Sequence, residues 1–274
     1  MKHITMLVVV VLASTFSVSL AHAQTAPSDE QARALAIEAV TKATGTAKAE
    51  LNTRRLENLE DDFFSFQRLI KGQIKKAAYF YHVQDGGWHI ISPDEVTYST
   101  HSSRVWYVAI STTDGEAFGL FGFKNATEDF TRLVTKLPVE VLNTSKAQSF
   151  ARFYLDMIYQ QQFIIYDELS LKHHAEDHFV GYANSQEPIA KKEQRFHHWW
   201  NEFKATKMTG PLAPTAKAEG NNRYRVEMKI LQMTVGLPPE LWQWSLEIHS
   251  DGASRLVEKR PLFPTKVGTT ATTR

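Results

Sequence analysis

The residues with the clearest potential for chemistry lie close together in the His173–His178 cluster, which reads His-His-Ala-Glu-Asp-His. If this stretch is helical, His174 and His178 lie one turn apart on the same face, and that spacing lets two imidazoles bind one metal ion. A third ligand would come from Asp177, Asp167, Glu168 or a residue distant in sequence. A metalloprotease helix carries Glu directly after the first His, as the base that acts on metal-bound water, whereas Ala175 stands in that place here. The cluster predicts a divalent-metal site at most, and a solvated polar loop would explain the same residues.

Two aromatic groups could form ligand platforms but are better explained by packing. Trp199 and Trp200 share about one third of the circumference of a predicted helix with other aromatic residues, which is typical of a buried helix face. Trp242 and Trp244 alternate with polar residues along a predicted strand, so burial is the better interpretation than an exposed sugar-binding platform.

Adjacent carboxylates that could serve a hydrolase occur at 60–62, 128–129 and 167–168, among other places. A glycoside hydrolase needs two carboxyls at a set separation in a cleft, which adjacency in sequence does not provide. Asp62 and Asp167 are therefore candidates only in the sense that any carboxylate is. The sequence contains no nucleophile elbow, phosphate-binding loop, dinucleotide fingerprint or calcium loop.

Composition excludes several classes of function. The 274 residues include no Cys, so thiol catalysis, iron–sulfur clusters, cysteine zinc sites and disulfide bonds are ruled out. There are 31 Lys and Arg against 30 Asp and Glu, and this near balance does not favour a nucleic-acid partner or an anionic membrane surface.

The N-terminus has the three parts of a cleavable signal peptide. Lys2 provides the positive start, and an apolar run follows over 6–12 and continues weakly to Leu20. Ala21 and Ala23 place small residues at the positions read by a signal peptidase, which predicts cleavage before Gln24. The apolar run is too short for a permanent anchor, which needs about 20 apolar residues, and no second long run follows. We therefore expect an exported protein, periplasmic or extracellular, whose mature chain has no membrane span.

Helices are predicted by their caps and periodicity. Ser28 and Gln31 form a capping box for a helix that ends at Gly45. Further capping boxes are expected at Asn125 with Glu128 and at Ser145 with Gln148, the second opening a mostly buried helix to about 161. Another helix is expected from Pro188 to about 208. A helix is also expected from about 47 to 61, residues 62–70 are open between helix and strand, and 162–187 is expected to be irregular.

Strands are predicted as antiparallel hairpins. One hairpin is expected over 78–91 and another over 104–123, where Asp114-Gly115 forms the turn. Residues 223–230 and 242–249 alternate between apolar and polar side chains. They are expected to pair with Val235 opposite Leu241, a register that sets Lys229 against Glu247 and Glu227 against His249.

These patterns together predict an α+β fold, in which an antiparallel sheet built from hairpins packs against several amphipathic helices. After the signal peptide (1–23) we expect one globular domain over 24–264, with a split near 138–145 as the alternative, and a disordered tail over 265–274. With no catalytic constellation evident, the leading hypothesis is a non-catalytic exported protein that binds an unknown protein or small molecule in the cell envelope. The alternative is a metal-dependent hydrolase that uses the His173–His178 cluster. No cofactor is evident.

Overall fold

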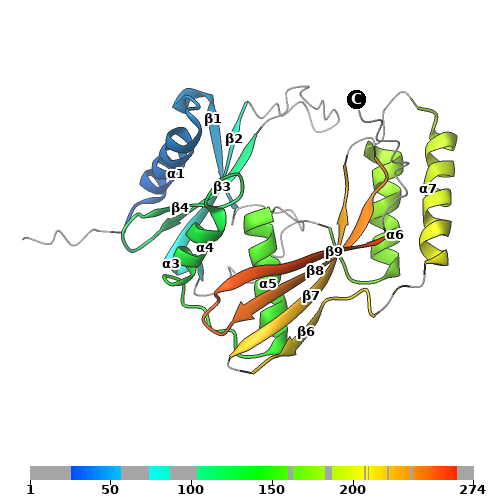
Figure 1. The fold of residues 1–274 in the computed structure, drawn as a ribbon. Coiled ribbons are helices and arrows are strands. Elements are labelled where there is room, and N and C mark those ends of the chain that lie inside the picture. The colour runs from blue at the N-terminus through cyan, green and yellow to red at the C-terminus, as the bar shows by residue number, and fades with distance from the viewer. Residues whose placement is uncertain are drawn as a thin grey trace, which may run out of the picture.

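The computed structural model describes residues 26–56, 74–86, 104–159, 163–182, 187–206, 208, 210–220, 222–234 and 237–263 (Figure 1). Four predictions fall outside the described residues: the signal peptide, the assignment of 62–70, the return strand at 88–91 and the C-terminal tail.

Helices and antiparallel strands alternate in groups along the chain, so the α+β class is as predicted. The N-terminal elements are α1 (Asp29–Thr44), β1 (Leu51–Arg55), α3 (Ile74–Ala77), β2 (Ala78–Asp85), β3 (Val105–Ser111), β4 (Ala117–Gly119) and α4 (Ala126–Val134). The remaining elements are α5 (Thr144–Tyr159), β5 (Ile164–Ile165), α6 (Glu168–Asp177), α7 (Ile189–Ala205), β6 (Thr215–Ala218), β7 (Arg223–Gln232), β8 (Glu240–His249) and β9 (Ser254–Phe263). A 3-10 turn (Lys48–Glu50) precedes β1, and a π-helical turn (His178–Tyr182) follows α6.

The strands form two antiparallel sheets instead of one. The first has the order β1-β2-β3-β4, and the second has the order β5-β7-β8-β9 with β6 also paired to β7. One core cluster contains side chains of both sheets, such as Phe80 and Trp244, together with Phe130 of α4 and Phe153 of α5. The layers therefore run α1, first sheet, α4 and α5, second sheet, because α1 packs on the opposite face of the first sheet against Tyr81 and its neighbours (Figure 1).

Local signals placed α1, α5 and α7 correctly. The Ser28–Gln31 capping box is present, with both reciprocal hydrogen bonds, and Gly45 ends α1 in the left-handed conformation. Helix α5 is buried over most of its surface, as its wide apolar arc predicts, although Asp156 on the expected polar side is only 3% exposed. The Asp114-Gly115 hairpin is also confirmed, since β3 pairs with β4.

Four local predictions are wrong. Residues 51–55 are strand instead of helix, because Leu51 to Arg55 pair in register with Asp85 to Tyr81 of β2, and this pairing overrides the local pattern. Asn125 makes no capping hydrogen bond because its backbone is not extended as a cap requires. At α5 the backbone N–H of Lys146 donates to Asn143 Oδ1 at 2.9 Å, so the helix begins before the expected cap at Ser145. The segment expected to be irregular contains α6.

The register of β7 and β8 also differs from the prediction. Leu231 lies opposite Leu241 instead of Val235, which sets Lys229 against Gln243 and Glu227 against Ser245. The apolar side chains of Leu231, Leu241 and Phe263 lie together against α6 and α7 in a second core cluster. Burial of these residues selects the observed register, and a shift of four residues keeps every side chain on its predicted face.

Candidate functional site

The histidines of the His173–His178 cluster lie on α6 and the turn that follows it. Asp167 begins the helix with a capping box, in which the backbone N–H of Ser170 donates to Asp167 Oδ1 at 2.6 Å. The hydrogen bonds from Ser170 hold the pKa of the Asp167 carboxyl below its usual value, so this candidate carboxylate serves as a cap. Asp62, the other candidate, lies outside the described residues.

The three predicted metal ligands make separate contacts. His173 Nε2 lies 3.4 Å from Asp177 Oδ2, and His178 Nε2 forms a hydrogen bond with the backbone oxygen of Leu237 at 2.8 Å. His174 is half-buried beside Phe163, with ring centroids 5.3 Å apart, and this burial lowers its pKa. Within the described ranges no three His, Asp or Glu side chains are grouped so that they could hold a metal ion. The metal site stays a prediction that these contacts do not support.

The aromatic candidates are packed as expected. Trp199 is 2% exposed, and its indole N–H donates to the backbone oxygen of Pro239 at 3.0 Å. Trp244 is 1% exposed, with the Lys259 ammonium nitrogen 3.7 Å from its ring centroid. Trp242 is half-buried. Their positions therefore favour core packing over a sugar-binding platform.

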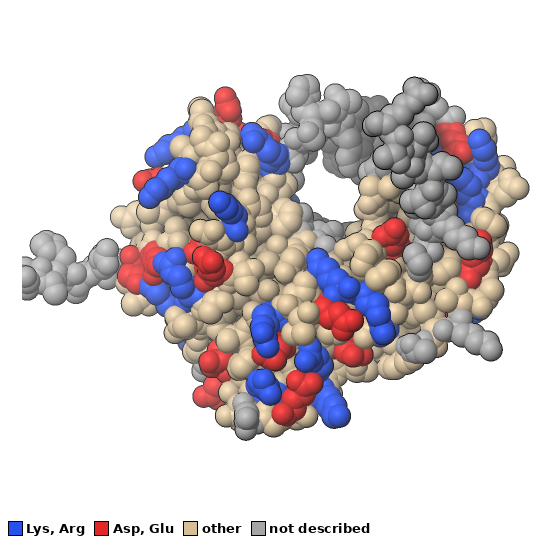
Figure 2. Space-filling model, viewed as in Figure 1, with Lys and Arg blue, Asp and Glu red and all other residues tan. Residues whose placement is uncertain are grey.

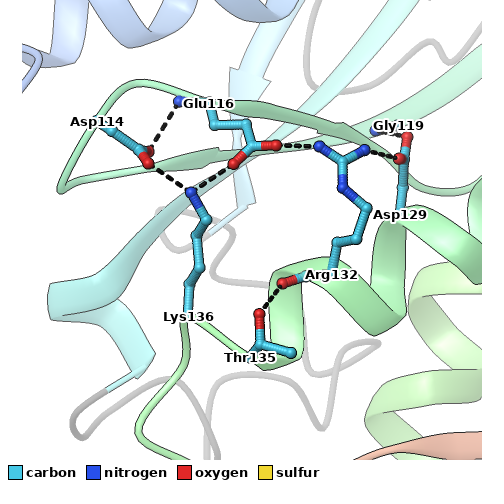
Figure 3. A network of polar contacts seen from close by, with 7 residues as sticks. All are labelled: Asp114, Glu116, Gly119, Asp129, Arg132, Thr135 and Lys136. Carbon is cyan, nitrogen blue, oxygen red and sulfur yellow. Dashed lines mark hydrogen bonds and ion pairs between the residues drawn. The ribbon is translucent and has the colours of Figure 1, made fainter.

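A polar network joins the β3–β4 hairpin to α4 (Figure 3). Lys136 pairs with both Asp114 and Glu116, and Arg132 pairs with Glu116 and with Asp129. The other carboxylate oxygen of Asp129 accepts the backbone N–H of Gly119 at 2.9 Å. Hydrogen bonds from Lys136 lower the pKa of Asp114 to about 2 and lower that of Glu116. Because each charge here has an opposite partner inside the network, this cluster clamps the hairpin to the helix and offers no unsatisfied group to a ligand.

The outer face of the second sheet is different. α5 packs on the inner face of this sheet, so the side chains on β6–β9 that alternate with the core-facing ones point outward (Figure 1). Figure 2 shows Lys and Arg interleaved with Asp and Glu over these strands. Among the described residues, α6 and α7 cover the far end of this face, beyond Lys229, through the second core cluster.

Strand register arranges these outward residues in three bands across the sheet. The arginine band consists of Lys217, Arg225, Glu247 and Arg255. The carboxylate band consists of Thr215, Glu227, Ser245 and Glu258. The lysine band consists of Lys229, Gln243 and Arg260.

Glu247 is the centre of the arginine band. The Nε and Nη2 atoms of Arg255 donate to its two oxygens at 3.0 and 3.1 Å, and His249 Nε2 lies 2.9 Å from Oε1. These hydrogen bonds, with that of Arg255 the strongest, lower the pKa of Glu247 to about 2. The carboxylate is therefore charged and satisfied within the fold, and it neutralises only part of the positive charge around it.

A groove of about 600 Å³ follows the carboxylate band across β6–β9. Its lining consists of that band together with Lys217 and Arg225 of the arginine band, Glu219, Ala216 and Val257. Ser245 is only 5% exposed, and its hydroxyl makes no hydrogen bond within the part of the chain that the structure describes. In the same described part, neither Glu227 nor Glu258 forms an ion pair. The groove thus contains a hydroxyl and two carboxylates that have no hydrogen-bond or ion-pair partner in the described part of the chain, and this is the strongest candidate site.

Sequence reasoning missed this site although it identified the outward residues. The alternation along β7 and β8 predicts one buried and one solvated face, but it does not indicate a binding site on the solvated face. The residues that form the groove come from four strands, and only the correct register brings them together.

No helix in the described ranges combines the length and apolar character needed to cross a membrane. Comparison with protein-family models, with curated proteins and with solved structures finds no match for this chain.

Proposed function

We propose that this is an exported, non-catalytic binding protein of the cell envelope, which takes its ligand in the groove across β6–β9. The observation that carries the proposal is Ser245, which is 5% exposed and whose hydroxyl has no hydrogen bond in the described part of the chain, at a groove that also holds two carboxylates without ion pairs among the described residues. A ligand that hydrogen-bonds this hydroxyl would use a group that the described fold leaves without a protein partner.

Binding is a better account of the groove than catalysis. A serine nucleophile needs an adjacent base within hydrogen-bonding distance, and Ser245 has none among the described residues. Export is supported by the three-part signal over residues 1–23. Purification of the mature protein from the periplasm of a bacterial host tests it, with an intact mass that begins at Gln24 as the expected result.

A thermal-shift screen tests the binding proposal. The mature protein is heated with peptides, sugars, lipids and divalent metals, in parallel with a Thr215→Trp variant that fills the groove from its exposed edge. A ligand at about 100 times its dissociation constant adds roughly 2.7 kcal/mol, or about 5–10 °C in a domain of this size. We expect at least one compound to stabilise wild type and not Thr215→Trp.

The matched control is Thr131→Trp, which adds the same ring at an exposed position on α4. It should respond as wild type does. A ligand that stabilises all three proteins equally would place binding elsewhere, and a flat response to every class would contradict the proposal.

A further inference from the structure

We infer that the outer face of the second sheet binds an extended peptide whose Lys side chain enters the groove and is flanked, two residues away on each side, by Asp or Glu. This inference rests on the proposed function and deepens it by naming the class of ligand. It follows from three features of the outer face: the groove floor, the charge on both sides of it, and the spacing of the bands.

The groove floor suits a primary ammonium group. By register Ser245 lies between Glu227 on β7 and Glu258 on β9. An ammonium has three donors that spread from one point. The groove offers the Ser245 hydroxyl and the carboxylates of Glu227 and Glu258, while the Arg225–Glu219 ion pair and Lys217 line its other side. The two carboxylate-bearing backbones are two strands apart, about 9–10 Å. That separation favours a single compact cation between them over a flat guanidinium, which prefers both oxygens of one carboxylate.

The bands on both sides of the groove carry excess positive charge. In the lysine band, Lys229 Nζ and Arg260 Nη2 both donate to Gln243 Oε1, at 3.0 and 3.2 Å, so two cations share one neutral acceptor. Lys229 is 4% exposed and forms no ion pair within the described residues. In the arginine band, Arg255 pairs with Glu247 and Arg225 pairs with Glu219 at 3.3 Å, so the cations of Lys217, Arg225 and Arg255 meet two carboxylates and one positive charge remains in excess. A ligand with only amino groups would be repelled from both sides, whereas carboxylates beside the ammonium would be attracted.

The spacing of the bands matches an extended peptide. Outward residues along a strand repeat every two residues, about 6.6 Å, and the alternate side chains of any extended peptide repeat at the same distance. A peptide laid along β7 and β8 therefore places successive alternate side chains over the arginine, carboxylate and lysine bands. The outer bands are about 13 Å apart, so a free amino acid or a simple amine cannot reach both.

Blocked synthetic peptides test this assignment with the mature protein, residues 24–274. The matched peptide contains Glu-Ser-Lys-Ser-Glu, the inverted peptide Lys-Ser-Glu-Ser-Lys, and the permuted peptide Lys-Ser-Glu-Ser-Glu. Calorimetric titration in about 50 mM salt should show the matched peptide bound about tenfold or more tightly than the inverted one, with the permuted peptide between them. Raising the salt to about 500 mM should weaken the matched binding, because Lys217, Glu258 and Arg260 are exposed charges that salt screens.

A charge-reversal variant makes the test specific to the groove. Glu227→Lys/Glu258→Lys should lose the matched peptide and gain a peptide with Glu-Ser-Glu-Ser-Glu. Glu38→Lys/Glu176→Lys changes the net charge equally at exposed positions on α1 and α6, and it should bind as wild type does. Thermal unfolding of both variants shows whether they are folded before binding is compared.

Equal binding of the matched and inverted peptides, absence of matched binding at millimolar concentration, or equal effects of the two double variants would each overturn the inference. If another compound stabilises wild type but not Thr215→Trp while the matched peptide does not bind, the peptide assignment fails and the proposed function stands. If neither occurs, both fail.

Discussion

Gly252, in the turn between β8 and β9, provides a sharp test of how the second sheet joins the shared core. Its backbone has φ of +86°, a conformation that residues with a side chain rarely adopt. A Cβ there would lie 2.8 Å from Val134 Cγ1, 3.0 Å from Phe150 Cζ and 3.1 Å from Val139 Cγ1. These atoms belong to α4, to α5 and to the connection between them, so the turn is packed directly against the helical layer.

Gly252→Ala should lower the free energy of unfolding through two separate effects. The left-handed backbone costs a residue with a Cβ about 1–2 kcal/mol. Forcing the methyl group into a close-packed site adds about 1–3 kcal/mol. Together they predict a loss of about 2–5 kcal/mol, which corresponds to a melting temperature lower by about 4–20 °C at 2–4 °C per kcal/mol.

Gly86→Ala is the matched control. Gly86 has φ of +89°, and a Cβ there would meet nothing within 4 Å, so only the backbone cost of about 1–2 kcal/mol applies. Urea denaturation followed by circular dichroism gives both unfolding free energies. If the two variants lose the same stability, the turn does not pack against the helices as described, and the reasoning is refuted.

Three further predictions concern single residues. Hydrogen bonds, chiefly from Arg255, lower the pKa of Glu247 to about 2 from an ordinary 4.5, so the charged carboxylate should stabilise the fold above about pH 4.5 and lose that effect as the pH falls towards 2. Urea titrations should show that the unfolding free energy of Glu247→Gln depends less on acid pH than that of wild type, and an unchanged dependence would contradict the assignment. Trp199→Phe removes the buried hydrogen bond to Pro239 and should cost about 1–3 kcal/mol by calorimetry, whereas a neutral change would show that the oxygen finds another partner. Zinc should shift the melting temperature equally in wild type and His174→Ala, and a shift confined to wild type would instead establish a metal site on α6.

Local signals were enough for much of the fold. Ser28 and Gly45 bound α1 because a capping side chain and a left-handed glycine act within one turn of the chain. The Asp114-Gly115 turn was predictable for the same reason. Where the outcome depended on a partner distant in sequence, local signals failed, as for β1, whose pairing with β2 joins residues about thirty positions apart.

The candidate metal site illustrates the same division. The sequence spacing places His174 and His178 one turn apart if the stretch is helical. The structure confirms a helix there, since α6 includes His174 and ends at Asp177, next to His178. Whether a third ligand lies nearby depends on how α6 packs, and in the structure His178 turns to the backbone of Leu237 instead. Periodicity contains no information on such contacts.

The sequence by itself determined which side chains of β7 and β8 face the core, because strict alternation assigns each residue to one face of the pleated sheet. It did not determine the register, since any shift by an even number of residues leaves those faces unchanged. Burial of Leu231 and Leu241 against α6 and α7 selected the observed pairing. That choice set Ser245 beside Glu227, so the groove and its bands of charge were decided by the tertiary structure alone.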